Sequence, residues 1–358
     1  MEHRVDAWLL FAVCAILGAS LVTLSTVGPV VGRDLLARQT LWGAAGIAVL
    51  WGLSRLRPDA YLRVAAPLYV AGLATLVAVL LIGETRSGTR GWFALGPLTV
   101  QPSEFARLAT ILAIAAWLAR REDDRLRLRE CGVLVGGVGL AALLVLLEPD
   151  LGVALTYLPV LVAALWLGGL PRWAFLAAAV VAVAVAVGAW HTALQPYQKE
   201  RILTLLDAER DPYGAGYQMR QSKIAVGAGG LVGQGVGEGS QSMLRFLPAQ
   251  HTDFVFAVWA EATGFLGSTA LLLAYALLLF RIGFVAATAE SRWGITVTTL
   301  VGTWLAFQVM VNVGMVVGIL PTTGITLPLF SYGGSSLLTT AAALGVVESV
   351  WRHRLVYQ

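Results

Sequence analysis

The sequence predicts an all-α, polytopic membrane protein with about ten transmembrane helices. Composition is the first reason: of 358 residues, 58% are hydrophobic and only 13% are charged. That charged fraction is about half of what an ordinary soluble protein carries. The apolar residues also come in runs near the length of about 20 residues that a helix needs to cross a bilayer. These runs lack the two-residue alternation that is typical of membrane β-barrels.

Ten apolar runs are candidate spans, with ends uncertain by a few residues. They cover residues 7–27, 38–54, 65–83, 102–119, 132–148, 150–168, 173–190, 254–280, 295–320 and 333–350. Only Glu148, Pro149 and Asp150 separate the fifth run from the sixth. The first run is too long for a signal-peptide core, and no small-x-small cleavage pattern follows it, so it is interpreted as a true span. We therefore expect one integral membrane domain over 1–358, with a long loop at about 191–252 between the seventh and eighth spans.

Basic residues in the short connections predict how the spans are oriented. Fourteen arginines lie at one set of span ends, whereas the short loops of the other set hold four. The arginine-rich side should be cytoplasmic, which places both termini inside a plasma (inner) membrane and the 191–252 loop outside. The net charge of +4 is typical of a membrane protein and does not indicate nucleic-acid binding. Neither Cys14 nor Cys131 suits a disulfide, and no Cys/His metal spacing occurs.

Polar sequence gathers on the predicted outer side in four stretches: 84–107, 148–152, 195–261 and 312–336. In the first stretch, glycines mark a loop and Pro102 opens the fourth helix. Glu104 and Arg107 are three residues apart and share a face of that helix. A self-contained ion pair would explain them. Ionisable residues inside spans are costly and usually face a cavity, however, so we favour a functional cavity.

The third stretch contains a glycine-rich segment from Gly227 to Gly239. A phosphate-binding loop of the P-loop or dinucleotide type is excluded, because GxxxxGK[ST] is absent and no strand precedes the segment. Cytosolic nucleotide would also lie on the other side of the membrane. We expect a tight, re-entrant turn in which glycine permits positive φ angles and a close approach of helices.

Two acids follow this segment. Thr252 is a candidate N-cap for the eighth helix, and Asp253 would then lie in its first turn, where the helix dipole favours a carboxylate. Helix stabilisation alone could explain Asp253. Glu261 lies roughly 12 Å further along the axis and is harder to explain without a function. His251 fits an ordinary interfacial loop histidine. In the fourth stretch, hydroxyls such as that of Ser331 can cap a helix or bind phosphate, and capping is the simpler explanation.

Together the four stretches resemble the SEDS family of bacterial membrane proteins for shape, elongation, division and sporulation. The matching segments read RGWFALGPLTVQPSEFARLA, EPDLGVAL, QSKIAVGAGGLVGQGVGEGSQSMLRFLPAQHTDFVFAVWAEATGFLG and NVGMVVGILPTTGITLPLFSYGGSSLL. They occur in the order of the family and cover nearly the whole chain. The combination of LPxxHTDFxFAV with PLxSYGGSS at this spacing is highly specific.

The resemblance implies a peptidoglycan glycosyltransferase that polymerises lipid II into β-1,4-linked glycan strands at the outer face of the membrane. Short termini and LPLFSYGGSS look most like the branch that serves cell elongation and rod-shape maintenance. The implied partners are a class B penicillin-binding protein, which is a transpeptidase, and the rest of the elongation machinery.

The essential aspartate of the family matches Asp253, its loop tryptophan matches Trp92, and its fourth-helix and eighth-helix acids match Glu104 and Glu261. Two positions depart from the family. Arg107 stands where lysine is usual, which keeps the charge and changes the geometry. The residue before Glu261 is alanine where a second acid is usual.

The implied reaction joins a sugar 4-hydroxyl to an anomeric carbon that carries a lipid pyrophosphate. Because the donor is α-linked and the product β-linked, one inverting displacement suffices. It needs a general base and charge stabilisation on the pyrophosphate. Asp253 is the candidate base. The candidate substrate contacts, many of them basic, are Trp92, Glu104, Arg107, Lys199, Arg201, Arg210, Arg245, His251, Glu261 and Ser331. A divalent cation, Mg²⁺ or Mn²⁺, is an open alternative for that charge stabilisation, although no clean cation cage is evident.

Two other classes of function stay open. A lipid II flippase would use Glu104, Arg107 and Glu261 along a path, and intramembrane charges suit it. Its polar positions should continue to the cytoplasmic side, however, whereas here they cluster outside. A non-catalytic scaffold would only recruit the transpeptidase.

Overall fold

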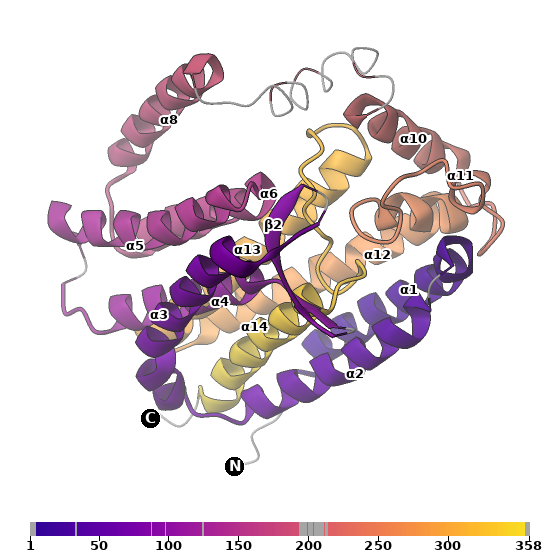
Figure 1. The fold of residues 1–358 in the computed structure, drawn as a ribbon. Coiled ribbons are helices and arrows are strands. Elements are labelled where there is room, and N and C mark those ends of the chain that lie inside the picture. Colours follow the sequence, from indigo (N-terminus) through magenta and orange to yellow (C-terminus); the bar gives the residue numbers. More distant parts are fainter. Residues whose placement is uncertain are drawn as a thin grey trace.

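The computed structural model describes residues 5–32, 34–86, 88–96, 98–123, 125–192, 199, 203, 211 and 214–354. Helices dominate it (Figure 1), and each of the ten predicted spans contains a helix. The sixth span is divided into α6 (Leu151–Leu155) and α7 (Tyr157–Leu167). The other nine are α1 (Ala7–Val31), α2 (Leu35–Ser54), α3 (Pro58–Ile82), α4 (Pro102–Ala119), α5 (Leu128–Leu147), α8 (Arg172–Thr192), α12 (Val255–Thr288), α13 (Arg292–Val316) and α14 (Gly334–His353).

Six of the described helices are long and apolar enough to cross a membrane, namely α1, α3, α4, α5, α12 and α13. Together with the positions of the other helices, they confirm a polytopic membrane fold. Lipid cannot hydrogen-bond to the backbone, so long apolar segments must satisfy their own peptide groups as helices. That constraint is why hydropathy alone located these elements.

The centre of the bundle is formed by α4 and α13, which pack against each other. Around them, α3 lies along α4, α1 along α12, and α2 along α14 (Figure 1). Small residues allow this close packing in a membrane, where apolar surface alone gives helices no preference for each other. A Cβ atom added to Gly46 of α2 would lie 2.6 Å from Leu337 of α14. One added to Gly345 of α14 would lie 2.8 Å from the carbonyl oxygen of Leu50.

The stretch after α3 is a small antiparallel sheet, where the sequence predicted a loop. Its strands are β1 (Glu84–Arg86), β2 (Thr89–Leu95) and β3 (Leu98–Val100), in the spatial order β1-β2-β3. Glu84 pairs with Trp92, and Phe93 pairs with Val100. Gly88, with φ of 85°, permits the tight turn between β1 and β2. The prediction of a loop is therefore wrong in this segment, whereas the predicted helical membrane fold stands for the rest of the described chain.

The long connection between α8 and α12 is partly helical. It contains α10 (Ala215–Ala228) and the short α11 (Ser240–Met243). The inner face of α10 packs on α12 and α13, and the Ser222 hydroxyl donates to the Val316 carbonyl at 2.7 Å. The sequence of α10 is too polar to stand out as an apolar run, so this helix within the long connection over 191–252 was not predicted.

The two described chain ends lie at one end of the bundle (Figure 1), where a hydrogen bond joins them and ion pairs surround it. The Asp6 backbone N–H donates to Glu348 of α14 at 3.1 Å, and the Asp6 carboxylate pairs with Arg281 of α12 at 2.7 Å. Arg352 in turn pairs with Glu348 at 3.1 Å. Residues just after the amino terminus and just before the carboxyl terminus therefore lie on the same side of the bundle.

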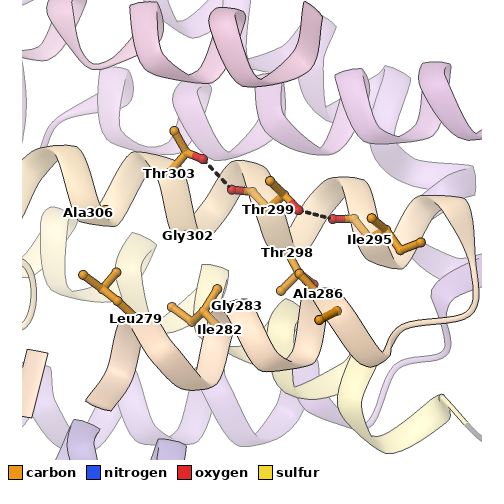
Figure 2. Close-up of a pocket in the computed structure, with 11 residues that line it drawn as sticks. Leu279, Ile282, Gly283, Ala286, Ile295, Thr298, Thr299, Gly302, Thr303 and Ala306 are labelled. Carbon is orange, nitrogen blue, oxygen red and sulfur yellow. Dashed lines mark hydrogen bonds between the residues drawn. The ribbon is translucent and has the colours of Figure 1, made fainter. Parts of the chain in front are cut away.

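A groove of about 540 Å³ runs between α12 and α13 (Figure 2). Its walls are mostly small and apolar: Leu279, Ile282, Gly283, Ala286, Ala287, Ile295, Gly302 and Ala306 line it with three threonines. The Thr299 and Thr303 hydroxyls donate to carbonyls of their own helix at 2.7 and 2.8 Å, as Figure 2 shows. None of the candidate site residues lines this groove, so the candidate site lies elsewhere in the molecule.

Candidate active site

Asp253 lies in a turn that precedes α12. The helix begins at Val255, and Phe254 occupies the N-cap position without a side-chain cap bond. The Thr252 hydroxyl donates to the Ala249 carbonyl at 3.3 Å instead of capping the helix. The predicted N-cap role of Thr252 and the first-turn position of Asp253 are therefore wrong. The half-buried Asp253 side chain belongs to a non-helical turn, so the helix dipole alone does not account for it.

Asn312 of α13 holds this turn from the bundle side. It is fully buried, and its Nδ2 atom donates to the Asp253 carbonyl at 2.9 Å and to the Ile325 carbonyl at 2.7 Å. Ile325 belongs to the connection between α13 and α14. One amide group therefore joins α13, the Asp253 turn and the α13–α14 connection.

Ser331 holds the same turn from the α13–α14 connection. Its hydroxyl donates to the Thr252 carbonyl at 2.7 Å and accepts from the Leu327 N–H at 2.8 Å. The residue is 4% exposed. The Ser331 hydroxyl thus stabilises the turn, and its contact with substrate stays a prediction. The adjacent Tyr332 N–H donates to the His251 carbonyl at 2.9 Å, and the half-buried His251 ring lies 5.9 Å from the Tyr332 ring.

The Asp253 carboxylate faces the segment 323–325 of that connection. A Cβ atom added to Gly324, which has φ of 75°, would lie 3.8 Å from Asp253 Oδ2. On its other side this segment touches α6, because a Cβ atom on Gly152 would collide with the Thr323 carbonyl oxygen. Segment 323–325 therefore lies between the Asp253 turn and a second polar cluster, which surrounds α6.

The core of this second cluster is the ion pair of Glu104 and Arg107 on α4. The side chains share a helix face as predicted, and both are almost fully buried, at 3% and 0% exposure. Arg107 Nη1 also donates to the Thr156 hydroxyl at 3.0 Å, and the guanidinium stacks 4.4 Å from the Trp304 ring centre. The arginine thus uses its planar geometry in a way that lysine cannot. Because the pair is largely self-satisfied, its main visible role is to organise the cluster.

Asp150 brings α4 and α6 together at the outer edge of this cluster. Its Oδ2 atom accepts from Gln101 Nε2 at 3.1 Å, and its Oδ1 atom caps α6 by accepting from the Val153 N–H at 2.9 Å. The Gln101 backbone N–H donates to Ser335 of α14 at 3.0 Å. The starts of α4, α6 and α14 therefore meet at one point.

Glu148 begins the polar stretch 148–152 and the segment EPDLGVAL, but no role was predicted for it. The side chain is fully buried, and neither carboxyl oxygen has a hydrogen-bond partner among the described residues. Strand β2 crosses directly over it: a Cβ atom on Gly91 would lie 2.7 Å from Glu148 Oε2, and the Arg90 N–H donates to the Glu148 carbonyl at 3.2 Å. Trp92, half-buried, is the next residue of that strand. The contacts of Arg90 and Gly91 with Glu148 therefore determine the position of Trp92, the next residue.

Glu261 of α12 binds the backbone of the outer connection near α11. Its Oε1 and Oε2 atoms accept from the Gln241 and Ser242 N–H groups at 2.7 and 3.1 Å. The side chain is fully buried and holds the start of α11. Both carboxylate oxygens are thus engaged by backbone N–H groups, and a contact of Glu261 with substrate stays a prediction.

Helix α12 is broken at Gly264, where φ is 67° and ψ is −160°. The glycine-rich segment supplies hydrogen-bond partners to the backbone on both sides of this break. Four backbone hydrogen bonds connect the segment to both sides of the break: Phe265 N–H to Gly230 O at 2.9 Å, Leu266 N–H to Leu231 O at 3.1 Å, Gln234 N–H to Glu261 O at 2.9 Å, and Gly235 N–H to Ala262 O at 3.1 Å. Positive φ angles occur at Gly230, Gly233, Gly235 and Gly237. The predicted positive φ angles and close approach to a helix are confirmed.

The remaining candidates are the basic residues of the long connection. Arg245 is exposed in the turn after α11. Lys199 is half-buried, but its immediate neighbours are not described, and Arg201 and Arg210 lie outside the described residues. Within the described part of the chain, no group of three or more His, Cys, Asp or Glu side chains is placed to hold a metal ion.

Comparison with known proteins gives matches along the whole chain. The family model described as "Cell cycle protein", for FtsW, RodA and SpoVE, matches residues 3–355. Peptidoglycan glycosyltransferase MrdB of Escherichia coli K12 is 38% identical over 353 residues, which cover 98% of this chain and 94% of MrdB. A probable peptidoglycan glycosyltransferase FtsW of Nitrosococcus halophilus is 34% identical over 358 residues, covering 96% and 92%.

Solved structures agree with these sequence matches. A chain from a peptidoglycan synthase complex, studied for the coordination of polymerization and crosslinking, has a TM-score of 0.85 and 36% identity, covering 98% of this chain and 99% of that one. The rod shape determining protein RodA of Thermus thermophilus has a TM-score of 0.73 and 33% identity, covering 98% of both chains. The chain therefore belongs to the FtsW/RodA/SpoVE family, the SEDS proteins that its motifs resemble.

Proposed function

We propose that this membrane protein is a peptidoglycan glycosyltransferase that polymerises lipid II into β-1,4-linked glycan strands. The names of its relatives support the activity. One structural observation carries the chemical proposal: the Asp253 carboxylate projects from a non-helical turn that buried side chains hold beside segment 323–325. A half-buried carboxylate at a fixed position is suited to act as a general base.

In the proposed step, Asp253 accepts the proton of a sugar 4-hydroxyl while that oxygen attacks the anomeric carbon of a second lipid-linked sugar. The new C–O bond forms as the bond to pyrophosphate breaks, and the configuration inverts from α to β. The lipid pyrophosphate leaves with the bonding electron pair. Since pyrophosphate is a good leaving group, no second carboxyl group has to act as a strong acid.

The negative charge of the leaving group has to be stabilised by cations. Arg107 is paired with Glu104, so we assign this role mainly to Arg245, Lys199, Arg201 and Arg210 of the outer connection. Mg²⁺ or Mn²⁺ remains a proposal for the same role, with Asp253 as one candidate ligand. The described residues offer no cage of three or more acids or histidines, and no step above depends on a metal.

We further propose that the active site faces the outside of the plasma (inner) membrane and that both termini are cytoplasmic. The arginine asymmetry of the short loops supports this orientation, and the described chain ends share one side of the bundle. The solved complex that resembles this chain couples polymerization to crosslinking, which supports a class B penicillin-binding protein as partner. The similarity to a rod shape determining protein supports a role in elongation.

The test is polymerisation of lipid II by the purified protein together with its transpeptidase partner, followed by separation of glycan chains on a gel. We expect Asp253→Asn to lower the rate by at least about 100-fold, a loss of the size that general base catalysis supplies. The matched control is Glu84→Gln, which neutralises an exposed carboxylate of strand β1 that pairs only at the surface with Arg86.

Three outcomes separate the candidate functions. Full-length glycan from Asp253→Asn would exclude Asp253 as the base. Transfer of lipid II across vesicle membranes without polymer, by wild type and Asp253→Asn alike, would establish a flippase. Absence of both activities together with stable partner binding would indicate a scaffold. The buried charges at the opposite end of the bundle pair with each other through Asp6, Arg281, Glu348 and Arg352, which disfavours an open polar path there.

A further inference from the structure

Asn312 is the single asparagine of the sequence and is fully buried near the end of α13. Both hydrogen atoms of its side-chain amide are used: Nδ2 donates to the Asp253 carbonyl at 2.9 Å and to the Ile325 carbonyl at 2.7 Å. These carbonyls belong to the two segments that face each other across the proposed site. The Asp253 side chain itself is not the acceptor.

The chemistry of these two bonds is specific to an amide. A primary amide nitrogen supplies two donors, an ionised carboxylate supplies none, and a hydroxyl supplies one with a shorter reach. The bond to the Asp253 carbonyl fixes that peptide plane, from which the carboxylate projects. The bond to Ile325 fixes the residue directly after Gly324, whose added Cβ would lie 3.8 Å from Asp253 Oδ2. One nitrogen atom therefore sets the position of the carboxylate relative to the segment that it faces.

We propose that Asn312 is a positioning residue for glycosyl transfer, which holds the Asp253 carboxylate in register with segment 323–325. This inference rests on the proposed role of Asp253 as the base. Loss of the Asn312 side chain leaves the base and the substrate contacts in the chain but removes their alignment. A misplacement of about 1 Å at a reacting group can lower a rate by about 100-fold. The expected effect is therefore a fall in kcat of about 100-fold, with KM for lipid II within about threefold of wild type.

The experiment compares Asn312→Ala, Asn312→Asp and Asn312→Ser with matched changes at Gln308. Gln308 carries the same functional group one turn earlier on α13 and is similarly buried, at 2% exposure. Gln308→Ala and Gln308→Glu therefore control for burial and for loss of an amide. Initial rates of polymerisation are measured against lipid II concentration with the partner present, and the Tm of each variant is measured in the same lipid nanodiscs. We expect Asn312→Ser, which keeps one donor, to retain more kcat than Asn312→Ala.

Several results would overturn the proposal. One is a kcat within threefold of wild type for a folded Asn312→Ala or Asn312→Asp variant. Another is a rise in KM at constant kcat, which would make Asn312 a substrate contact. If losses in kcat follow losses in Tm equally at positions 312 and 308, the role is only structural. Asp253→Asn is assayed alongside: if it stays active, the base assignment fails by itself, whatever the Asn312 variants do.

Discussion

The guanidinium group of Arg107 contacts three neighbouring side chains at once. It pairs with Glu104, donates to Thr156 and stacks on Trp304. Such a fully buried pair contributes little compared with apolar packing, but each partner depends strongly on the other. Glu148 is a contrasting case, because its buried carboxyl group has no hydrogen-bond partner among the described residues. These two residues lead to opposite expectations for mutation.

Removing only one partner of the ion pair should be severe. Arg107→Met leaves the Glu104 carboxylate buried without its cation, and we expect a loss of about 3–5 kcal/mol in the free energy of unfolding. The double variant Glu104→Leu with Arg107→Met should regain most of that loss, since both charges are gone. Tm in nanodiscs measures both effects. Equal stability of the single and double variants would contradict this account.

Glu148→Gln should be tolerated or slightly stabilising. The amide has nearly the same shape and carries no charge, whereas an unpartnered carboxylate is costly to bury. Glu148→Ala, in contrast, leaves a space beneath strand β2 and should lower both Tm and polymerisation by displacing Trp92. The measurement is Tm together with the rate for both variants. A loss of activity in Glu148→Gln equal to that in Glu148→Ala would show that the charge itself is needed.

At the scale of elements, the β1–β2 hairpin and the glycine-rich segment approach their neighbours more closely than an ordinary helix could. The hairpin of β1 and β2 lies over Glu148 because Gly91 allows its backbone to pass. The glycine-rich segment completes the hydrogen bonding of α12 across Gly264. Sequence reasoning anticipated the close glycine approach, since glycines at this density permit it. It missed the hairpin and α10, because short or polar elements leave no hydropathy signal.

Two glycines of this segment allow a matched test. Gly233 and Gly237 both have φ of 85°, so alanine should be strained at either position by about 1–2 kcal/mol. Only at position 233 would the new Cβ collide with the α12 backbone, at the Ala262 carbonyl, whereas at 237 the nearest atom is the Thr26 methyl at 3.5 Å. We expect Gly233→Ala to lower Tm and activity clearly more than Gly237→Ala. Equal effects of the two would show that the φ angle alone matters.

For the whole molecule, the lipid environment explains what could be predicted. Long apolar runs in a bilayer have to be helices, so all ten expected spans contain one. The pairing of Glu104 with Arg107 was also predictable, because a spacing of three residues is a local property. The partners of Asn312, Ser331 and Glu261 were not, because each of them is brought from a distant segment by the packing of the bundle.

The break at Gly264 divides the longest helix into unequal parts. Residues 255–263 follow the Asp253 turn, and residues 265–288 run on to the end of the bundle where the described chain ends lie. Hydrogen bonds connect both parts to the glycine-rich segment at the break. The proposed catalytic turn is thus followed by a short helical piece. This piece contacts α10 and is hydrogen-bonded to α11 and to the glycine-rich segment. Gly264 therefore separates the helical piece that follows the proposed catalytic turn from the longer piece that continues along the bundle.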